Sequence, residues 1–434
     1  MEDFLSCRIR PVYFRYLAAA FGSSFIACVY SMIDSAVVGQ YYGPDGASSM
    51  VVTAPFWSIM ISLGLLMGLG GAVVFSSLRG QGNSGQTGSI QENSNRKLSN
   101  EFFTVSLIGC LIFTVIIMAF LFTCEDQILT LFGADENVLP IAREYMVYVR
   151  WSVPFFVFGQ TLIAFLRNDG APGLATWCVV AGGVFNIVGD FVFTFTLDMG
   201  AMGAGIASAG GGVLNIIVLV CHFFSKKNTL RLEPPTHFFR QMGRIIVVGF
   251  AAFFIEIAAG IITIIFNNQI LKYLGSTTLA VYGVIGNIVM FVQCCSNSVG
   301  QAAQPMLSVN YGGKRPDRIR KIMWYAIGTA IVFGIIWIVL CEAGPNWFTY
   351  IFMSPTDEVL EIAPAIIRTY AISFILLPFN VFSTYYFQAI LKNGISFIIS
   401  IGRGIVISGI LLFVLPLISP SAIWYAMPVT ELIV

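Results

Sequence analysis

Long apolar stretches follow one another along the whole chain, with short polar segments between them. Most hold about 20 residues or more, the length that a helix needs to cross the hydrocarbon core of a bilayer. The pattern therefore predicts an all-α membrane protein with twelve spanning helices. The predicted spans are 14–38, 50–78, 98–122, 138–166, 173–196, 202–224, 243–272, 277–309, 321–343, 358–391, 396–417 and 421 to the end. The last has only about 14 residues before Val434, so we expect the twelfth helix to be incomplete.

The two halves of the chain match each other at constant offsets, and each half holds six spans. The matched pairs are Gly43 with Gly275, Gly80 with Gly312, Pro154 with Pro378, and Gly170 with Gly394. We predict two pseudo-symmetric six-helix lobes, 1–225 and 243–434, joined by a basic linker at 226–242 that contains Pro234 and Pro235. Duplicated helix bundles are common in secondary transporters.

Composition excludes several classes of protein. Hydrophobic residues are 57% of the chain and charged residues 10%, against roughly 45–50% and 25% in soluble domains. The net charge of +1 implies no nucleic-acid partner. The chain has two histidines and nine cysteines without a CxxC pair, which argues against a metal centre and a Ser-His catalytic pair, so we expect neither an enzyme nor a cofactor.

Lysine and arginine gather on one side of the predicted spans. If the amino terminus is cytoplasmic, the basic linker and both ends of each lobe are inside, and Lys272 is the one basic residue in the outside connections. This asymmetry follows the positive-inside rule. We therefore expect a multi-pass plasma-membrane protein with a cytoplasmic amino terminus, and we expect a monomer.

Candidate chemistry lies in the few ionisable groups inside the spans, because each one there costs several kcal/mol unless it faces a cavity or a partner. Asp34 is in the first span, Asn186 and Asp190 share a face of the fifth, and Ser208 is in the sixth, all at similar depth. These oxygen ligands suit a hard cation or a stored proton, and Na⁺ is a candidate at Asp34, Asn186 and Asp190. The alternative is that the aspartates only cap helices or bond neighbouring hydroxyls.

Polar side chains also form stripes along helices of the second half. They are Glu256 and Asn267 in the seventh span, Gln293, Asn297 and Gln301 in the eighth, and Asn380, Thr384 and Gln388 in the tenth. One interpretation is the wall of a substrate cavity, and the other is hydrogen bonding between helices. The acidic pair itself is not duplicated, since the repeat aligns Asp34 with Phe266 and Asp190 with Val414.

The chain resembles the multidrug and toxic compound extrusion (MATE) transporters, especially their DinF-like branch. The matching segments are MIDSAVVGQYYG, FLRNDGAPGLATW, FNIVGDFVFTF, GAMGAGIASAGGG, and YYFQAILKNG with SIGRGIVISGILLFVLP. The resemblance implies that Asp34, Asn186, Asp190 and Ser208 form an amino-lobe cation site. It also matches Glu256 to an acid of the NorM-like branch, whereas Asn380 stands where that branch has an aspartate.

We therefore expect an antiporter that exports amphipathic, cationic organic compounds in exchange for H⁺ or Na⁺. A flippase for a lipid or a lipid-linked saccharide would use the same architecture, although the scarcity of intramembrane Arg and Lys argues against a pyrophosphate-lipid substrate. An intramembrane enzyme and a passive channel are the remaining alternatives.

Overall fold

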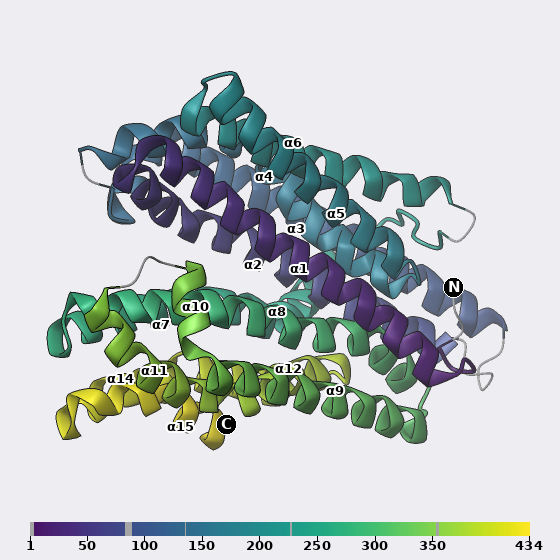
Figure 1. Ribbon diagram of the computed structural model, residues 1–434. Coiled ribbons are helices and arrows are strands. Elements are labelled where there is room, and N and C mark those ends of the chain that lie inside the picture. The colour runs from purple at the N-terminus through teal and green to yellow at the C-terminus, as the bar shows by residue number, and fades with distance from the viewer. Residues whose placement is uncertain (1–3, 83–88, 135, 226–227, 353–355) are drawn as a thin grey trace. The chain divides into compact units, whose positions relative to one another are not determined.

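A computed structural model describes residues 4–82, 89–134, 136–225, 228–352 and 356–434, and within these residues it contains helices and no strands (Figure 1). The first half holds α1 (Ile9–Tyr42), α2 (Pro44–Gly82), α3 (Ser89–Leu131), α4 (Val138–Asn168), α5 (Pro172–Gly189), η1 (Asp190–Thr196), α6 (Gly200–Val220) and η2 (Cys221–Phe224). The second half holds α7 (Phe238–Tyr273), α8 (Ser276–Gly312), α9 (Pro316–Ala343), α10 (Pro345–Phe352), α11 (Asp357–Ala371), η3 (Ile372–Ile375), α12 (Leu377–Ala389), α13 (Asn393–Ile401), η4 (Gly402–Val406), α14 (Ile407–Ile418), η5 (Pro420–Tyr425) and α15 (Ala426–Ile433).

These elements confirm the predicted all-α membrane fold. Among the described residues, eleven helices are long and apolar enough to cross a bilayer. The short pair η5 and α15 lies where the sequence predicts the twelfth segment. The small helix α10 was not predicted, because its eight residues are too few to register as a span.

The tenth predicted span, 358–391, is not one regular helix. It consists of α11, the 3₁₀ turn η3 and α12. Pro378 lies in the first turn of α12, where its missing N–H and fixed φ are tolerated. By contrast, Pro55, Pro154 and Pro305 lie inside α2, α4 and α8, which continue through them.

The chain divides into two compact units. Unit 1 comprises Met1–Arg8, Ala18–Phe253 and Ser308–Arg315, and unit 2 comprises Ile9–Leu17, Phe254–Leu307 and Pro316–Val434. Three long helices, α1, α7 and α8, therefore contribute residues to both units. The lobe boundaries that we expected from the sequence, 1–225 and 243–434, stay a prediction.

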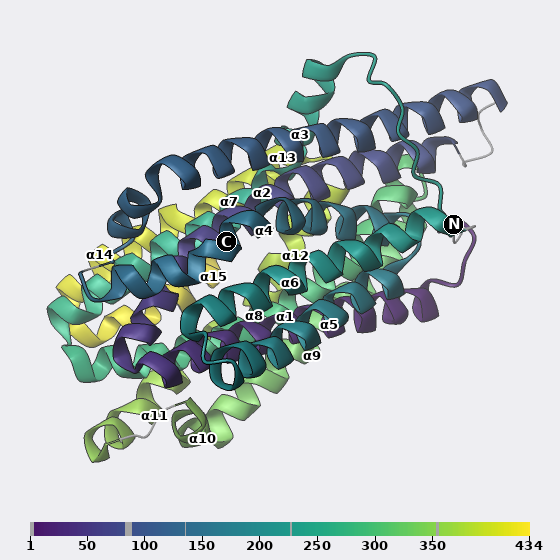
Figure 2. The same ribbon diagram turned by 90° about the horizontal axis from the view of Figure 1, so that it is seen from above.

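Unit 1 is built around α2, which packs on α3 and α4 (Figures 1 and 2). Glycines on α2 allow this close approach, since a Cβ at Gly68 would lie 2.8 Å from the Thr161 Cα of α4. Thr161 also donates its hydroxyl to the Gly64 carbonyl at 3.0 Å. Small residues at such contacts let helix backbones approach each other in a membrane.

The linker between the predicted lobes is bonded to buried charges of unit 1. Asp169 accepts hydrogen bonds from the Thr229 amide at 3.0 Å and the Thr229 hydroxyl, and lies 2.8 Å from His222 Nε2. Glu101 accepts from the Thr236 amide at 3.0 Å and the Thr236 hydroxyl at 2.7 Å. These bonds fix the described part of the linker, and its first residues, Lys226 and Lys227, lie outside the described range.

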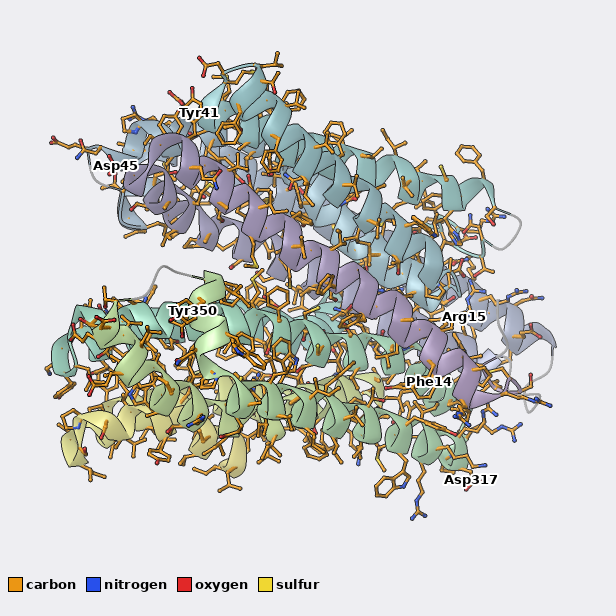
Figure 3. The ribbon with its side chains drawn as sticks, in the orientation of Figure 1. Phe14, Arg15, Tyr41, Asp45, Asp317 and Tyr350 are labelled. Carbon is orange, nitrogen blue, oxygen red and sulfur yellow. The ribbon has the colours of Figure 1, made fainter. Side chains whose placement is uncertain are left out.

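Within unit 2, α9 and α12 pack together, and α14 packs on α15. Figure 3 shows Asp317 at the beginning of α9 and Tyr350 on α10, which follows the far end of α9. In unit 1 the same figure shows Tyr41 and Asp45 together at the turn between α1 and α2.

Candidate functional site

The site lies in unit 1, where α4 and α6 bring hydroxyl groups to Asp34 of α1. Asp34 is 6% exposed. Its Oδ2 accepts a hydrogen bond from the Tyr145 hydroxyl of α4 at 2.8 Å and from the Ser208 hydroxyl of α6 at 3.4 Å. One carboxylate oxygen is therefore bonded, and hydroxyl groups supply the bonds.

Asn186 connects this group to the second carboxylate. Its Nδ2 donates to the Ser208 Oγ at 3.1 Å and lies 3.5 Å from Asp190 Oδ1. Asp190 has no exposed surface and Asn186 is 2% exposed. Hence Asp34, Ser208, Asn186 and Asp190 form one hydrogen-bonded chain, and the structure brings together the four residues that the sequence predicts as a site.

Four buried oxygen atoms of this cluster have no hydrogen-bond partner in the described part of the chain. They are Asp34 Oδ1, Asn186 Oδ1, Asp190 Oδ2 and Thr194 Oγ1. In the same part of the chain, no lysine, arginine or histidine forms an ion pair with Asp34 or Asp190. A buried oxygen without a partner costs free energy, as does a buried carboxylate without a counter-ion. Bound protons or a hard cation such as Na⁺ would remove both costs, because carboxylate, amide and hydroxyl oxygens are the ligands of such ions.

Small residues bring these helices close enough for the hydrogen bonds to form. A Cβ on Gly205 of α6 would collide with the Tyr145 carbonyl oxygen of α4. On α5, a Cβ at Gly189 would lie 2.9 Å from the Ala207 Cβ of α6. The Gly- and Ala-rich sequence of α6 therefore allows Ser208 to reach both Asp34 and Asn186.

The backbone changes its winding at the second carboxylate. Asp190 is the first residue of η1, a π-helix that continues α5 to Thr196. Single π-helical turns inside α-helices are rare and occur frequently at functional sites. The predicted polar face of Asn186 and Asp190 is buried in the structure, and so is Thr194.

Sequence reasoning missed Tyr145, which has no exposed surface and makes the shortest bond to Asp34. Nothing in its local sequence separates it from the other tyrosines, which number 16 in the chain. Only the packing of α4 against α6 shows that its hydroxyl points into the cluster. Two nearby arginines that the sequence also placed in spans instead pair with acids of α3, Arg143 with Asp126 at 2.5 Å and Arg150 with Glu125 at 3.0 Å.

The candidates of the second half are distributed differently. Glu256 and Asn267 of α7 and Gln293, Asn297 and Gln301 of α8 are partly exposed. Asn380, Thr384 and Gln388 of α12 are at most 4% exposed. Asn380 binds Glu431 of α15, and the Thr384 carbonyl accepts from Ser396 of α13 at 3.1 Å. These contacts favour helix packing for the α12 residues, whereas the α7 and α8 residues stay candidates for a substrate path.

Comparison with known proteins agrees with this architecture. The profile of the MatE family matches residues 19–192 and 250–414. The multidrug export protein MepA of Staphylococcus saprophyticus subsp. saprophyticus is 23% identical over 414 residues, which cover 94% of this chain and 88% of MepA. MepA of Staphylococcus aureus strain MRSA252 is 21% identical over 416 residues, with the same two coverages, 94% and 88%.

Solved structures share the fold. One is the outward-facing conformation of a multidrug resistance MATE family transporter of the MOP superfamily, with a TM-score of 0.89 at 19% identity over 99% of this chain and 94% of that chain. Another is a MOP superfamily transporter from Pyrococcus furiosus, with a TM-score of 0.88 at 19% identity and the same coverages, 99% and 94%. The DinF-like branch stays a prediction. Because the family profile covers most of both halves, the chain belongs to the MatE family.

Proposed function

We propose that this protein is an antiporter that exports amphipathic, cationic organic compounds and takes up H⁺ or Na⁺ in exchange. One observation carries the proposal: within the described residues, Asp34 and Asp190 are buried in one cluster without a basic partner, and four oxygen atoms of that cluster have no hydrogen bond. Such a cluster is stable when a cation or protons occupy it and is strained when they leave. That difference in free energy is what a coupling site requires.

Coupling follows if the two ligands favour different conformations. A cation that binds Asp34 and Asp190 more tightly in one conformation shifts the protein toward it, and a substrate that prefers the other conformation shifts it back. Alternating access between two lobes then moves the ligands in opposite directions. Asn186, Ser208 and Tyr145 hold the two carboxylates at a fixed spacing, and no covalent chemistry is involved.

The relatives support the choice of substrate. The similar Staphylococcus proteins are named multidrug export proteins, and one similar structure is titled a multidrug resistance transporter. Organic compounds are therefore favoured as substrates over lipid-linked saccharides. The uncompensated acids favour cationic compounds among them. Glu256, Asn267, Gln293, Asn297 and Gln301 are the weaker candidates for the substrate path.

The setting of this activity is part of the proposal. Basic residues of the linker and of the α8–α9 connection favour a cytoplasmic location for these segments and for the amino terminus, in a plasma membrane. A monomer is part of the proposal, because the hydrogen bonds of both carboxylates among the described residues come from side chains of the same lobe.

The test is export in liposomes that contain the purified protein and a fluorescent cationic dye. An imposed proton gradient and an imposed Na⁺ gradient, applied separately, distinguish the two coupling ions. We expect Asp34→Asn and Asp190→Asn to lower gradient-driven dye transport at least tenfold, and Glu256→Gln to lower it less. Asp198→Asn is the matched control, since it makes the same chemical change at an exposed carboxylate that bonds Tyr41.

Wild-type rates in Asp34→Asn, with normal amounts of folded protein, would contradict the coupling site. Lipid scrambling without gradient-driven dye transport would instead favour the flippase.

A further inference from the structure

Unit 2 contains a buried ion pair that the sequence did not predict. Glu431 of α15 is 2% exposed, and its Oε1 accepts a hydrogen bond from Arg403 Nε at 2.8 Å. Its Oε2 accepts from Asn380 Nδ2 at 2.8 Å, and the same Nδ2 lies 2.8 Å from the Glu431 carbonyl oxygen. Both carboxylate oxygens of Glu431 therefore have partners, and one partner is a cation.

Arg403 lies within the candidate membrane span Asn393–Ile418, and Glu431 reaches it from the short helix α15. Arg403 comes about ten residues after the beginning of this span. Ten residues of α-helix rise about 15 Å, half of a hydrocarbon core of about 30 Å. An ionisable residue at that depth is expensive and is by default a candidate for function.

The matching region of unit 2 carries no copy of the Asp34 cluster. Phe266, the residue that the repeat aligns with Asp34, has no exposed surface, and its ring stacks on Tyr282 with centroids 4.5 Å apart. The rings of Trp424 and Tyr370 lie 5.9 Å and 6.2 Å from Phe266. Aromatic rings therefore fill the place where unit 1 has carboxylate and hydroxyl oxygens.

The fifth spanning segment of each half contains a π-helix, and each π-helix contains a charged residue. In unit 1 the π-helix η1 begins with Asp190, which has no cationic partner in the described part of the chain. In unit 2 the π-helix η4 contains Arg403, which neutralises Glu431. The two units thus differ at a buried carboxylate. In unit 1 the Asp190 carboxylate can bind an exchangeable cation, whereas in unit 2 the Glu431 carboxylate is paired with a cationic side chain of the protein.

We infer that Arg403 is the permanent counter-ion of the Glu431 carboxylate in the second lobe. Because Arg403 always neutralises this carboxylate, cation exchange is confined to the Asp34–Asp190 cluster. A guanidinium stays protonated at every physiological pH, and it cannot leave the chain. Without it, Glu431 would be a buried carboxylate that needs a proton or Na⁺, as Asp34 and Asp190 do. The comparison with unit 1 rests on the proposed function, whereas the ion pair stands without it.

Few other ionisable groups surround Glu431. Tyr370 of α11 lies within electrostatic reach of both Glu431 and Arg403, and Tyr425 of η5 is 49% exposed. Neither α14 nor η3, which both pack on α15, contains an ionisable side chain. Because tyrosine ordinarily titrates near pH 10, a response between pH 5 and pH 8 would report Glu431.

The test measures ion-dependent stability in a variant whose first-lobe site is silent. In the Asp34→Asn/Asp190→Asn background, we expect the melting temperature of purified protein to be the same in NaCl and in choline chloride at pH 8. Adding Arg403→Met should lower the melting temperature in choline chloride. Either Na⁺ or a shift to pH 5 should raise the melting temperature of this variant again by about 3–6 °C. Arg403→Lys, which keeps the charge, should stay independent of ions, and so should Arg368→Met, a half-exposed control that pairs with Glu342.

Adding Glu431→Gln to Arg403→Met should remove the ion dependence and raise the melting temperature again. If the Arg403→Met variant does not accumulate, adding Glu431→Gln should recover its expression. The inference is overturned if Arg403→Met loses the same stability at every pH and Na⁺ concentration, or if Glu431→Gln fails to rescue it. This outcome does not depend on dye transport, so failure of the proposed function and failure of the inference are separable.

Discussion

At the scale of single residues, the candidate site depends on hydroxyl groups that hold carboxylates without neutralising them. Tyr145 and Ser208 donate to one oxygen of Asp34, and the other oxygen has no hydrogen-bond partner in the part of the chain that the structure describes. A basic residue in either position would have filled the site permanently, as Arg403 does for Glu431. If Asp34 exchanges its cation as we propose, the difference between Asp34 and Glu431 comes from one neighbouring group.

Tyr145→Phe tests this dependence. The substitution keeps the ring and removes the O–H donor, and a hydrogen bond to a charged group contributes about 1.5–3 kcal/mol. We expect gradient-driven dye transport to fall about tenfold or more, because a loss of about 1.4 kcal/mol corresponds to a factor of about ten. The amount of folded protein should change little. Tyr148→Phe on the same helix is the control, because Tyr148 is 41% exposed. Equal rates in the two variants would show that the Tyr145 hydroxyl does not support coupling.

At the scale of helices, close backbone contacts decide whether the site forms. Gly205 of α6 lies directly against the Tyr145 carbonyl of α4, one helical turn before Ser208. The approach of α4 to α6 and the hydrogen bonds at Asp34 therefore depend on the same glycine.

Gly205→Ala should separate α4 from α6. We expect a loss of stability of about 1–3 kcal/mol, typical of overpacking, together with a loss of dye transport. Gly260→Ala on α7 is the matched control, since nothing lies within 4 Å of a Cβ at that position. Thermal unfolding of both variants in detergent measures the difference, and an unchanged melting temperature in Gly205→Ala would contradict the close contact.

The position of the linker depends on the hydrogen bonds that Asp169 accepts. Asp169→Asn weakens the acceptor of the bonds from Thr229 and His222, so the linker should detach from unit 1 more often. We expect trypsin to cut after the exposed Arg231 about tenfold faster than in the wild type. This factor corresponds to a loss of about 1.4 kcal/mol from the free energy that holds the linker in place. Asp317→Asn at the beginning of α9 is the control. Equal cleavage rates in the two variants would mean that these bonds do not hold the linker.

At the scale of the whole molecule, the distribution of charge predicts how the chain lies in the membrane. Basic residues concentrate in the linker and in the α8–α9 connection, while the sequence predicts one basic residue, Lys272 in the last turn of α7, for the connections of the opposite side. Single cysteines at Arg231 and at Asp198, in a background without the native cysteines, should be labelled from opposite sides of intact cells. A membrane-impermeant thiol reagent should reach the Asp198 position and should miss the Arg231 position until the cells are opened. Labelling of the Arg231 position in intact cells would reverse the proposed orientation.

Much of the fold was predictable, because apolar length and charge placement are local properties of the chain. The eleven long apolar helices of the described residues follow from the sequence read in order, and so does the cluster of Asp34, Asn186, Asp190 and Ser208. The break of the tenth span at η3 and the helix α10 did not follow. Pro378 indicated a bend but not the 3₁₀ turn, and α10 is shorter than any span.

By itself, the sequence determined that this is an all-α membrane protein with a duplicated plan and with a pair of intramembrane aspartates in the first half only. Its tertiary structure alone decided what each acid contacts. Tyr145 of α4 reaches Asp34 of α1. Arg403 of η4 and Asn380 of α12 reach Glu431 of α15, so the contacts of each acid come from other helices. The reason is physical: the cost of burying a charge in the membrane is set by its residue type, whereas the groups that offset the cost come from other helices and depend on how the helices pack.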